Sequence, residues 1–305
     1  FPYYYRHMLR QYIVGECDEQ DMVVQSPEEY KERRIRLRLG QKVSSLDPDS
    51  RTLYLAHMEK VSYTRLLVCV GSVPRIPEVH YRYREHLTVM STLRHARALR
   101  ERMGDIRRVV MCGGDMVSFR IATTLAAHDK EVIFLVDEDA FWPLELTDER
   151  REDFAAALEE KGVTVRGDDV LTGVESTGTE ESGDRYVVRT KRDAEIHCDL
   201  VGAFFGLTPA IEWLQGTGLD LERGVLVDEY LRTNRPSIYA AGDCAEIYRP
   251  DLRNYWVSRG WPNALRLGEV AAKNLLGGEE SVDEPSTNVL QVDGIKVSTA
   301  WWREF

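Results

Sequence analysis

The sequence predicts an α/β protein, and three observations support this fold class. Short apolar runs, typical of strands buried on both faces, alternate with longer polar and amphipathic stretches that are typical of helices. Residues 107–136 contain a strand, a glycine turn, a helix and a second strand in that order, as a right-handed crossover requires. The 305-residue chain is 43% hydrophobic, which is enough for the buried cores of two domains.

Turn signals and hydrophobic periodicity define the expected elements of the first hundred residues. Ser26 can cap the helix-forming segment that follows it, whereas residues 34–39 alternate apolar and charged side chains, as a strand with one buried face does. The apolar run 66–70 ends at Gly71 and predicts a buried strand that leads into a loop. The full set is a helix that starts after Ser26, strands over 34–39, 51–55 and 66–70, a turn at 47–50, and a helix over 93–102.

The middle of the chain continues the alternation of strands and helices. Gly113 and Gly114 separate the first strand from its helix, and Thr147 can cap a later helix that Gly162 ends. The expected strands cover 107–112, 131–136, 163–166, 186–190 and 199–205, the helices cover 117–127 and 147–161, and residues 176–184 form a polar hairpin turn.

Composition excludes several classes of protein. The net charge of −11 opposes general binding to nucleic acid or anionic lipid, because both need clustered positive charge. No apolar run approaches the roughly 18 residues of a membrane-spanning helix. The five cysteines are far apart and form neither a metal motif nor a disulfide framework, so we expect a cytoplasmic protein. The chain starts at Phe1 without a signal-peptide pattern, and we expect it to begin inside a longer or processed chain.

The segment 233–246 carries the strongest indication of chemistry. Residues 238–241 predict a short buried strand, and Gly242 permits a close approach to the backbone at its carboxyl end. Asp243 follows directly, where a carboxylate can accept hydrogen bonds from a polyol and a following helix N-terminus can face a phosphate. This combination predicts a nucleotide or cofactor site.

The segment 233–246 resembles the second flavin motif of the FAD-dependent pyridine nucleotide-disulfide oxidoreductases. Within that superfamily it is most similar to the NADH-dependent nitrite reductase, rubredoxin reductase and ferredoxin reductase branch. The resemblance covers nearly the whole chain and rests on further motifs in the right order, namely Pro2–Arg6, 36–46, Cys69–Arg75, Phe205–Pro209, Trp261–Arg266 and Asn288–Val297. Each motif alone is weak, whereas their order and spacing together are specific.

The resemblance implies two Rossmann-like nucleotide-binding domains, each a three-layer ββα arrangement. Residues 1–100 and 224–305 would be the two parts of a discontinuous FAD-type domain, and residues 101–223 an NAD(P)-type Rossmann domain. In the family a GxGxxG unit precedes the Pro2–Arg6 motif and an interface domain follows the last strand pair. The FAD-type domain therefore lacks its first βαβ unit in this sequence, and we expect an upstream segment, a second chain or a loss of flavin binding to account for it.

The resemblance also implies which residues contact cofactors. The predicted FAD contacts are Arg6, Val43, Gly71, Gly242, Asp243, Trp261, Pro262 and Asn263. The predicted NAD contacts are Gly113, Gly114, Asp137 and Gly206. No side chain is expected to act as a nucleophile or metal ligand, because the isoalloxazine ring carries the redox chemistry.

The NAD fingerprint departs from the family pattern Gly-x-Gly-x-x-Gly-x-Glu. Gly113 is retained, but Asp115, Ser118 and Arg120 occupy the second glycine, the third glycine and the glutamate positions. A carboxylate where a pyrophosphate approaches is repulsive, which weighs against ordinary dinucleotide binding. NAD(P)H as the electron donor therefore stays open at the level of sequence.

Other candidate residues have simpler explanations. Cys17 and Cys244 are favoured as packing residues over redox thiols, and His7 as a surface or packing histidine over a proton relay. The arginine-rich stretch 82–108 is favoured as a solvated helix face, the alternative being a dock for an acidic electron carrier.

Two functional interpretations follow. The first is an FAD-dependent oxidoreductase subunit that passes electrons between NAD(P)H or another donor and an iron–sulfur or other redox protein. The second is a degenerate, non-catalytic reductase-like subunit with a structural role in a larger complex. Both interpretations predict redox-protein or subunit partners, no nucleic acid and no membrane span.

Overall fold

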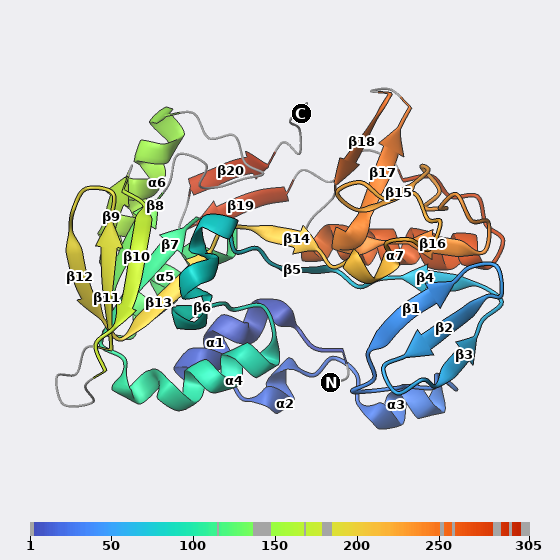
Figure 1. Ribbon diagram of the computed structural model, residues 1–305, viewed down its shortest axis with the longest axis horizontal. Helices are drawn as coiled ribbons and strands as arrows, with labels where there is room; N and C mark the ends of the chain where they lie inside the picture. The colour runs from blue at the N-terminus through green and yellow to red at the C-terminus, as the bar shows by residue number, and fades with distance from the viewer. Residues whose placement is uncertain are drawn as a thin grey trace. The chain divides into compact units, whose positions relative to one another are not determined.

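The computed structural model describes residues 3–114, 116–136, 148–167, 169–178, 185–250, 253–257, 260–282, 288–292 and 295–299 (Figure 1). The chain divides into two compact units. Unit 1 comprises Phe1–Leu37, Pro74–Gly206 and Val289–Val297, and unit 2 comprises Arg38–Val73, Leu207–Asn288 and Ser298–Phe305. Both units are therefore discontinuous in sequence.

A five-stranded parallel sheet forms the centre of unit 1, in the order β6-β13-β7-β8-β9 (Figure 1). Its strands are β6 (Leu87–Thr88), β7 (Arg108–Gly113), β8 (Glu131–Val136), β9 (Val163–Gly167) and β13 (Leu200–Phe204). Val110 on β7 lies opposite Ile133 on β8 and Val201 on β13. The predicted β-α-β order over 107–136 is confirmed, since β7, the helix α5 (Met116–Ala126) and β8 follow one another.

Helices cover one face of this sheet, and a second, antiparallel sheet covers the other. The helices are α4 (Leu93–Arg102), α5 and α6 (Asp148–Glu160), and the second sheet contains β10 (Leu171–Ser176), β11 (Tyr186–Thr190) and β12 (Glu195–Cys198). Met111 and Phe134 point into the helical core with Phe119, whereas Val110 and Ile133 join the core beneath the antiparallel sheet. The period-two alternation of apolar residues thus buries both faces. The predicted three-layer ββα arrangement is confirmed.

The N-terminal helices pack within unit 1. They are η1 (Arg6–Met8), α1 (Leu9–Val14), α2 (Glu19–Met22) and α3 (Pro27–Glu32), and the short helices η2 (Glu78–His86) and η3 (Met103–Asp105) follow later in the unit. Leu9, Ile13 and Met22 belong to the same core cluster as α4 and α5. Ser26 caps α3 as predicted, through a capping box with Glu29.

The strand predicted over 34–39 is wrong, because the structure has no strand between residues 34 and 42. Ile35 and Leu39, which would have formed its buried face, are each 47% exposed. The alternating pattern therefore meets no core, and regular pairing begins only at Val43.

Unit 2 is built from short strands around one helix. Its elements are β1 (Val43–Asp47), β2 (Thr52–Leu55), β3 (Lys60–Ser62), β4 (Leu66–Val68), β5 (Ser72–Pro74), β14 (Leu207–Pro209), η4 (Glu212–Leu214), β15 (Val225–Val227), β16 (Ile238–Ala240), η5 (Gly242–Cys244), β17 (Ala245–Arg249), β18 (Asn254–Val257) and α7 (Trp261–Leu275). The sheets are β1-β2-β3, β4-β16, β5-β14 and β15-β17-β18. A core cluster joins β1-β2-β3, β4-β16, β15-β17-β18 and α7, with Val68, Ile238, Ile247 and Leu267 among its members. The strand pair predicted over 288–297 is present as β19 (Asn288–Val292) and β20 (Ile295–Thr299), and most of it belongs to unit 1.

Candidate functional site

Two parallel strands of unit 2 end side by side and deliver two glycine turns. In the pairing of β4 with β16, Val68 lies opposite Ala240, and the backbone N–H of Ala241 donates to the Val68 carbonyl at 3.0 Å. Gly71 follows β4 with φ 66°, and Gly242 follows β16 with φ 78°. Both values lie in the left-handed region that favours glycine, so both turns depend on it. The two predicted residues are thus placed at the same end of a strand pair.

The carboxylate of Asp243 is held by donors from two separate segments. Ser72 Oγ donates to Asp243 Oδ2 at 2.8 Å, and the backbone N–H of Gly260 donates to Asp243 Oδ1 at 3.2 Å. Ser72 is buried, whereas Asp243 is only half-buried. Asp243 therefore keeps a fixed orientation while part of its surface stays accessible.

The start of α7 lies next to the Gly242 turn. A Cβ atom at Gly242 would meet only the Ala264 methyl group, at 3.7 Å. Gly260 precedes the helix with φ 98° and has no side chain that could cap it. Trp261 is 42% exposed and Asn263 is buried at 3%. The structure thus brings Gly71, Gly242, Asp243 and the segment Trp261–Asn263, six of the eight predicted FAD residues, to the ends of β4 and β16 in unit 2.

The other two predicted FAD residues lie elsewhere. Val43 is the first residue of β1 and pairs with Leu55 in the antiparallel sheet of unit 2. Arg6 belongs to unit 1, where its Nη2 donates to the backbone carbonyl of Ser91 at 2.6 Å.

The predicted NAD turn belongs to unit 1 and is closely packed. Gly113 has φ 93°, and a Cβ atom there would come within 3.0 Å of the Phe204 backbone and the Phe205 ring. The Gly114 N–H donates to the Phe204 carbonyl at 2.8 Å, and the Gly206 carbonyl accepts from Arg75 at 2.9 Å. These glycines join the ends of β7 and β13. Asp115 and Asp137 lie outside the described residues.

The residues that depart from the fingerprint occupy distinct positions on α5. Ser118 is fully buried, whereas Arg120 is exposed. The neighbouring Phe119 is also fully buried and contacts Phe134 of β8, with ring centroids 5.5 Å apart. The small Ser118 side chain therefore still permits close helix–sheet packing.

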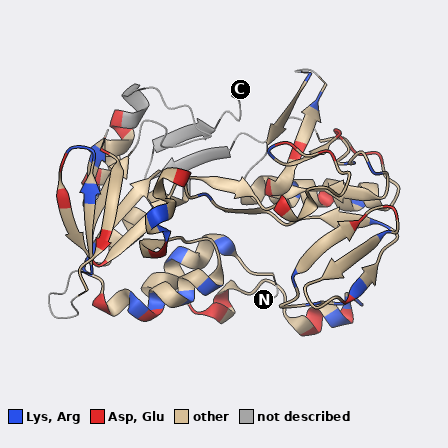
Figure 2. Cartoon of the chain, viewed as in Figure 1, with Lys and Arg blue, Asp and Glu red and all other residues tan. Residues whose placement is uncertain are grey.

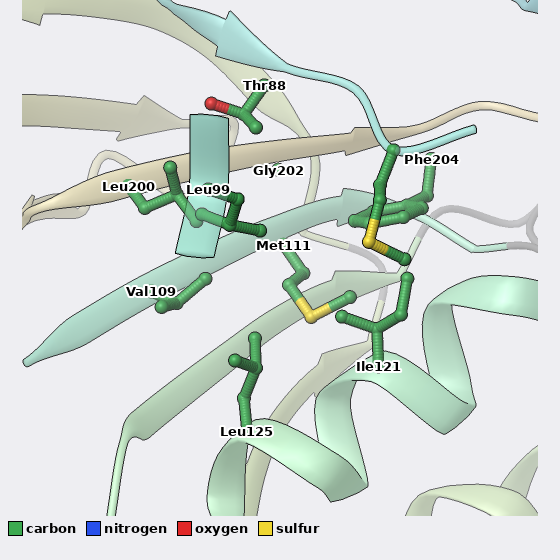
Figure 3. Close-up of a pocket in the computed structure, with 10 residues that line it drawn as sticks. Thr88, Leu99, Val109, Met111, Ile121, Leu125, Leu200, Gly202 and Phe204 are labelled. Atoms are coloured by element: carbon green, nitrogen blue, oxygen red, sulfur yellow. The ribbon is translucent and has the colours of Figure 1, made fainter. Parts of the chain in front are cut away.

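Unit 1 also encloses a small cavity between its parallel sheet and its helices (Figure 3). Met111 of β7 lies on the sheet side of the cavity, and Ile121 and Leu125 of α5 lie on the helix side. The volume is about 20 Å³, room for one water molecule, and the lining is almost entirely apolar. This cavity is a packing defect rather than a ligand site.

Two cysteines next to the glycine turns, Cys112 and Cys244, are packing residues. Cys112 and Cys244 are fully buried, and burial raises the pKa of both thiols above the ordinary value. Cys244 Sγ lies 3.5 Å from the Val68 carbonyl and 3.4 Å from the Ala241 carbonyl, beneath the strand ends. A thiol that stays protonated at neutral pH is a poor nucleophile.

The arginine-rich helix α4 is partly neutralised inside unit 1 (Figure 2). Arg97 pairs with Glu19, and Arg100 pairs with Asp18 at 3.0 Å and lies over the Tyr12 ring. Burial lowers the pKa of His7 below its ordinary value, and the positive charges of Arg120 and Arg10 lower it further.

No group of three potential metal ligands occurs among the described residues. Nor is any helix in that part of the chain long and apolar enough to cross a membrane.

Sequence reasoning missed the supports of Asp243. Ser72 lies within the motif Cys69–Arg75, but nothing in the sequence shows that its hydroxyl meets a carboxylate 171 residues away.

Glu246 is the last residue of the motif 233–246, and sequence reasoning assigned it no structural role. It is fully buried and accepts hydrogen bonds from the backbone N–H groups of Arg223 and Gly224, each at 3.0 Å. A charged residue inside an apolar strand is the signal that could have identified it.

Comparisons with known proteins extend over nearly the whole chain. The family model described as "Pyridine nucleotide-disulphide oxidoreductase" matches residues 3–268. The putidaredoxin reductase CamA of Pseudomonas putida is 26% identical over 289 residues, which cover 90% of this chain and 66% of that protein. The probable ferredoxin reductase CtmF of Castellaniella defragrans is 28% identical over 284 residues, which cover 90% of this chain and 67% of that protein.

Solved structures agree at the level of the fold. The ferredoxin reductase for the CYP199A2 system from Rhodopseudomonas palustris matches with a TM-score of 0.82 at 23% identity. The match covers 92% of this chain and 68% of that one. The chain thus spans about two thirds of the length of these relatives.

Proposed function

Because the chain belongs to the pyridine nucleotide-disulphide oxidoreductase family, we propose that it is part of an FAD-dependent electron-transfer reductase. In this proposal electrons pass from NAD(P)H, or from another donor, to an iron–sulfur or other redox protein. The observation that carries the proposal is the fixed Asp243 carboxylate beside the Gly242 turn and the start of α7. The names of relatives, which include a putidaredoxin reductase and a ferredoxin reductase, support the type of partner.

The residues around Asp243 fit a flavin with its polyol chain. The carboxylate can accept hydrogen bonds from ribityl hydroxyls, and Gly242 has no side chain to obstruct their approach. The start of α7, whose N-cap residue Gly260 has no side chain, offers a positive dipole end to an electron-rich ring edge. Trp261 at the start of α7 is 42% exposed and could contact a flat ring system there.

In this proposal the flavin supplies the redox chemistry, and the chain supplies binding and orientation. Asp243 would bind the ribityl chain, Gly71 and Gly242 would allow close backbone contact, and Trp261–Asn263 would face the ring. From the family resemblance we further propose that Val43 contacts the adenine and that Arg6 approaches the ring.

NAD(P)H is the proposed donor, and Gly113, Gly114, Asp137 and Gly206 are its proposed contacts in unit 1. The packing of Ser118 and Phe119 supports this assignment, because the strand–turn–helix scaffold of a dinucleotide site is retained. The replacement of fingerprint residues by Asp115, Ser118 and Arg120 favours the second candidate, a reductase-like subunit with a structural role. Asp115→Gly combined with Ser118→Gly separates the two, since the first candidate predicts tighter NADH binding and the second predicts no change.

A visible absorption spectrum of the purified protein, followed by anaerobic addition of NADH, tests the proposal. We expect a flavin band that bleaches with NADH. A band that bleaches only with dithionite would assign another donor. Absence of a band in protein isolated with its natural partners would overturn the flavin proposal and leave the structural subunit.

Asp243→Ala gives a sharper test of the site. We expect it to weaken FAD binding about tenfold to hundredfold, because a charge-assisted hydrogen bond is lost. Asp49→Ala is a suitable control, since Asp49 is an exposed acidic residue of the same unit that forms only a surface pair with Arg235 at 3.1 Å. Equal FAD affinities for the two variants would contradict the assignment of Asp243.

We also propose a cytoplasmic location. The buried thiols of Cys112 and Cys244, which form no disulfide among the described residues, support a reducing compartment.

A further inference from the structure

We propose that Ser72 is a positioning residue, which sets the orientation of the Asp243 carboxylate before a ligand arrives. The inference rests on the proposed function, since it assigns Ser72 a role in flavin affinity. It goes beyond the motif comparison, because it concerns a side chain that holds the acidic residue and need not touch the cofactor.

The contact between Ser72 and Asp243 is short and shielded. Ser72 Oγ donates to Asp243 Oδ2 at 2.8 Å, and Ser72 is only 7% exposed. The second carboxylate oxygen, Oδ1, accepts from the Gly260 N–H at 3.2 Å. An aspartate side chain has two rotatable torsions, and donors on both oxygens restrict both of them.

The backbone that carries Ser72 is itself anchored. Ser72 is the first residue of β5, which pairs with β14. The Gly71 carbonyl next to it accepts from the Ala210 N–H at 3.1 Å. On the preceding strand, the Val68 carbonyl accepts from Ala241 at 3.0 Å and ties this segment to the strand that leads to Asp243. The Ser72 hydroxyl is therefore presented from a fixed point.

The chain after Asp243 is clamped as well. Glu246 is fully buried, and its Oε1 accepts from Arg223 Nε at 2.7 Å. Its Oε2 accepts from the backbone N–H groups of Arg223 and Gly224. A Cβ atom at Gly224 would lie 2.8 Å from the Cys244 carbonyl, so this turn packs directly against the residue after Asp243. With the backbone held on both sides, the torsions of the Asp243 side chain are the remaining freedom, and Ser72 limits them.

The arrangement leaves acceptor capacity for a ligand. Each carboxylate oxygen can accept about two hydrogen bonds, and the described donors use one on each. The remaining acceptor sites have directions set by Ser72 and Gly260, so a polyol meets a preorganised acceptor and loses less entropy on binding. Without the Ser72 hydroxyl, the Gly260 N–H alone would orient the Asp243 carboxylate, and the ligand would have to supply the rest of the ordering.

A double-mutant cycle on FAD affinity tests this role in the complete protein. The variants are Ser72→Ala, Asp243→Ala and the two combined, with Ser62→Ala on the exposed β3 strand as the matched control. FAD is added to deflavinated protein and the dissociation constant is followed by flavin fluorescence. Thermal unfolding of each variant without FAD checks that it is folded.

We expect Ser72→Ala to weaken FAD binding about tenfold in the wild-type background. In the Asp243→Ala background the same substitution should change affinity less than about twofold, because a residue that acts through the Asp243 side chain has no effect once that side chain is gone. Ser62→Ala should bind FAD as the wild type does. If Ser72→Ala fails to fold, Ser72→Thr keeps the hydroxyl and should retain wild-type affinity.

The outcomes separate the two proposals. If wild-type protein does not bind FAD, the proposed function is overturned and the role of Ser72 with it. If wild-type protein binds FAD but Ser72→Ala weakens binding equally in both backgrounds, or not at all, the positioning role alone is overturned. For Ser72→Thr, a loss of affinity as large as that caused by Asp243→Ala would also overturn it.

Discussion

The glycine turns of the two units use the same residue type for different purposes. At Gly113 in unit 1, a Cβ atom would collide with the Phe204 backbone and the Phe205 ring. At Gly242 in unit 2, the nearest atom to such a Cβ is the Ala264 methyl group at 3.7 Å, an ordinary contact distance. Gly113 is therefore required by the packing of its own unit. Gly242 is required by backbone conformation alone and leaves the space in front of it open.

Each unit also holds a buried carboxylate that fastens neighbouring backbone. In unit 1, Asp199 Oδ2 accepts from the N–H groups of Arg107 at 2.7 Å and Arg108 at 2.9 Å, at the start of β7. In unit 2, Glu246 accepts two backbone N–H groups and the Arg223 guanidinium. Among the described residues, Asp199 accepts hydrogen bonds on one carboxylate oxygen, Oδ2, whereas Glu246 accepts them on both oxygens. The two units should therefore respond unequally to matched substitutions.

The largest expected effect is that of Gly113→Ala. The new methyl group has no room beside Phe204, and φ 93° is costly for any residue with a Cβ atom. We expect a loss of about 3–5 kcal/mol in the free energy of unfolding, measured by urea denaturation of the purified protein.

Gly242→Ala is the matched control in the other unit. The alanine would have to adopt the same positive φ but would not collide with a neighbour. We therefore expect a loss of about 1–2 kcal/mol in the free energy of unfolding. The comparison between the turns fails if the two substitutions destabilise the protein to the same degree.

Glu246→Gln should have the next largest effect. Every recorded partner of the Glu246 carboxylate is a donor, so a glutamine must direct its own NH₂ group at another donor. The substitution also removes the negative charge that pairs with Arg223, although partial exposure of Arg223 to water limits the cost. We therefore expect a loss of about 2–3 kcal/mol in the free energy of unfolding.

Asp199→Asn tests the same chemistry in unit 1. An asparagine can turn its carbonyl oxygen toward the two N–H groups and its NH₂ group away, so we expect a loss of about 1 kcal/mol in the free energy of unfolding. Should Asp199→Asn destabilise the protein as much as Glu246→Gln does, the number of oxygens engaged is not what distinguishes the two carboxylates.

Periodicity predicted the parallel sheet of unit 1 because its strands are apolar on both faces. β7, β8 and β13 all begin and end within one or two residues of their expected positions. The strand expected over 34–39 shows the limit of this reasoning, since alternation signals a strand only where a core lies on one side. The pattern around Val43 is weaker, yet β1 forms there because Leu46 reaches the core of unit 2.

The candidate site was predictable where its residues are adjacent in sequence. Gly242 and Asp243 stand at the end of a short apolar run and could be identified from that position. The partners Ser72 and Gly260 could not be, because their contacts with Asp243 join segments far apart in the chain and depend on how β4 and β16 pair. The buried ion pair of Glu246 and Arg223 was missed for the same reason.

The smallest expected effect concerns the attachment of the N-terminal helices to unit 1. Glu19 on α2 forms a two-pronged ion pair with Arg97 on α4 and accepts from Tyr12 Oη at 3.0 Å. The hydrogen bonds from Arg97 and, to a lesser extent, from Tyr12 lower the pKa of Glu19 below its ordinary value of 4.5.

The folded protein therefore binds a proton at the Glu19 carboxylate less readily than the unfolded protein does. The resulting stabilisation is fully present above the unfolded pKa and is lost as the pH falls through the folded pKa. Because the pair is largely exposed, we expect it to contribute less than about 1 kcal/mol. Urea unfolding of the wild type and of Glu19→Gln should differ by this amount at pH 7 and converge toward pH 3, and a difference that persists at pH 3 would mean that Glu19 stabilises the helices by packing rather than by charge.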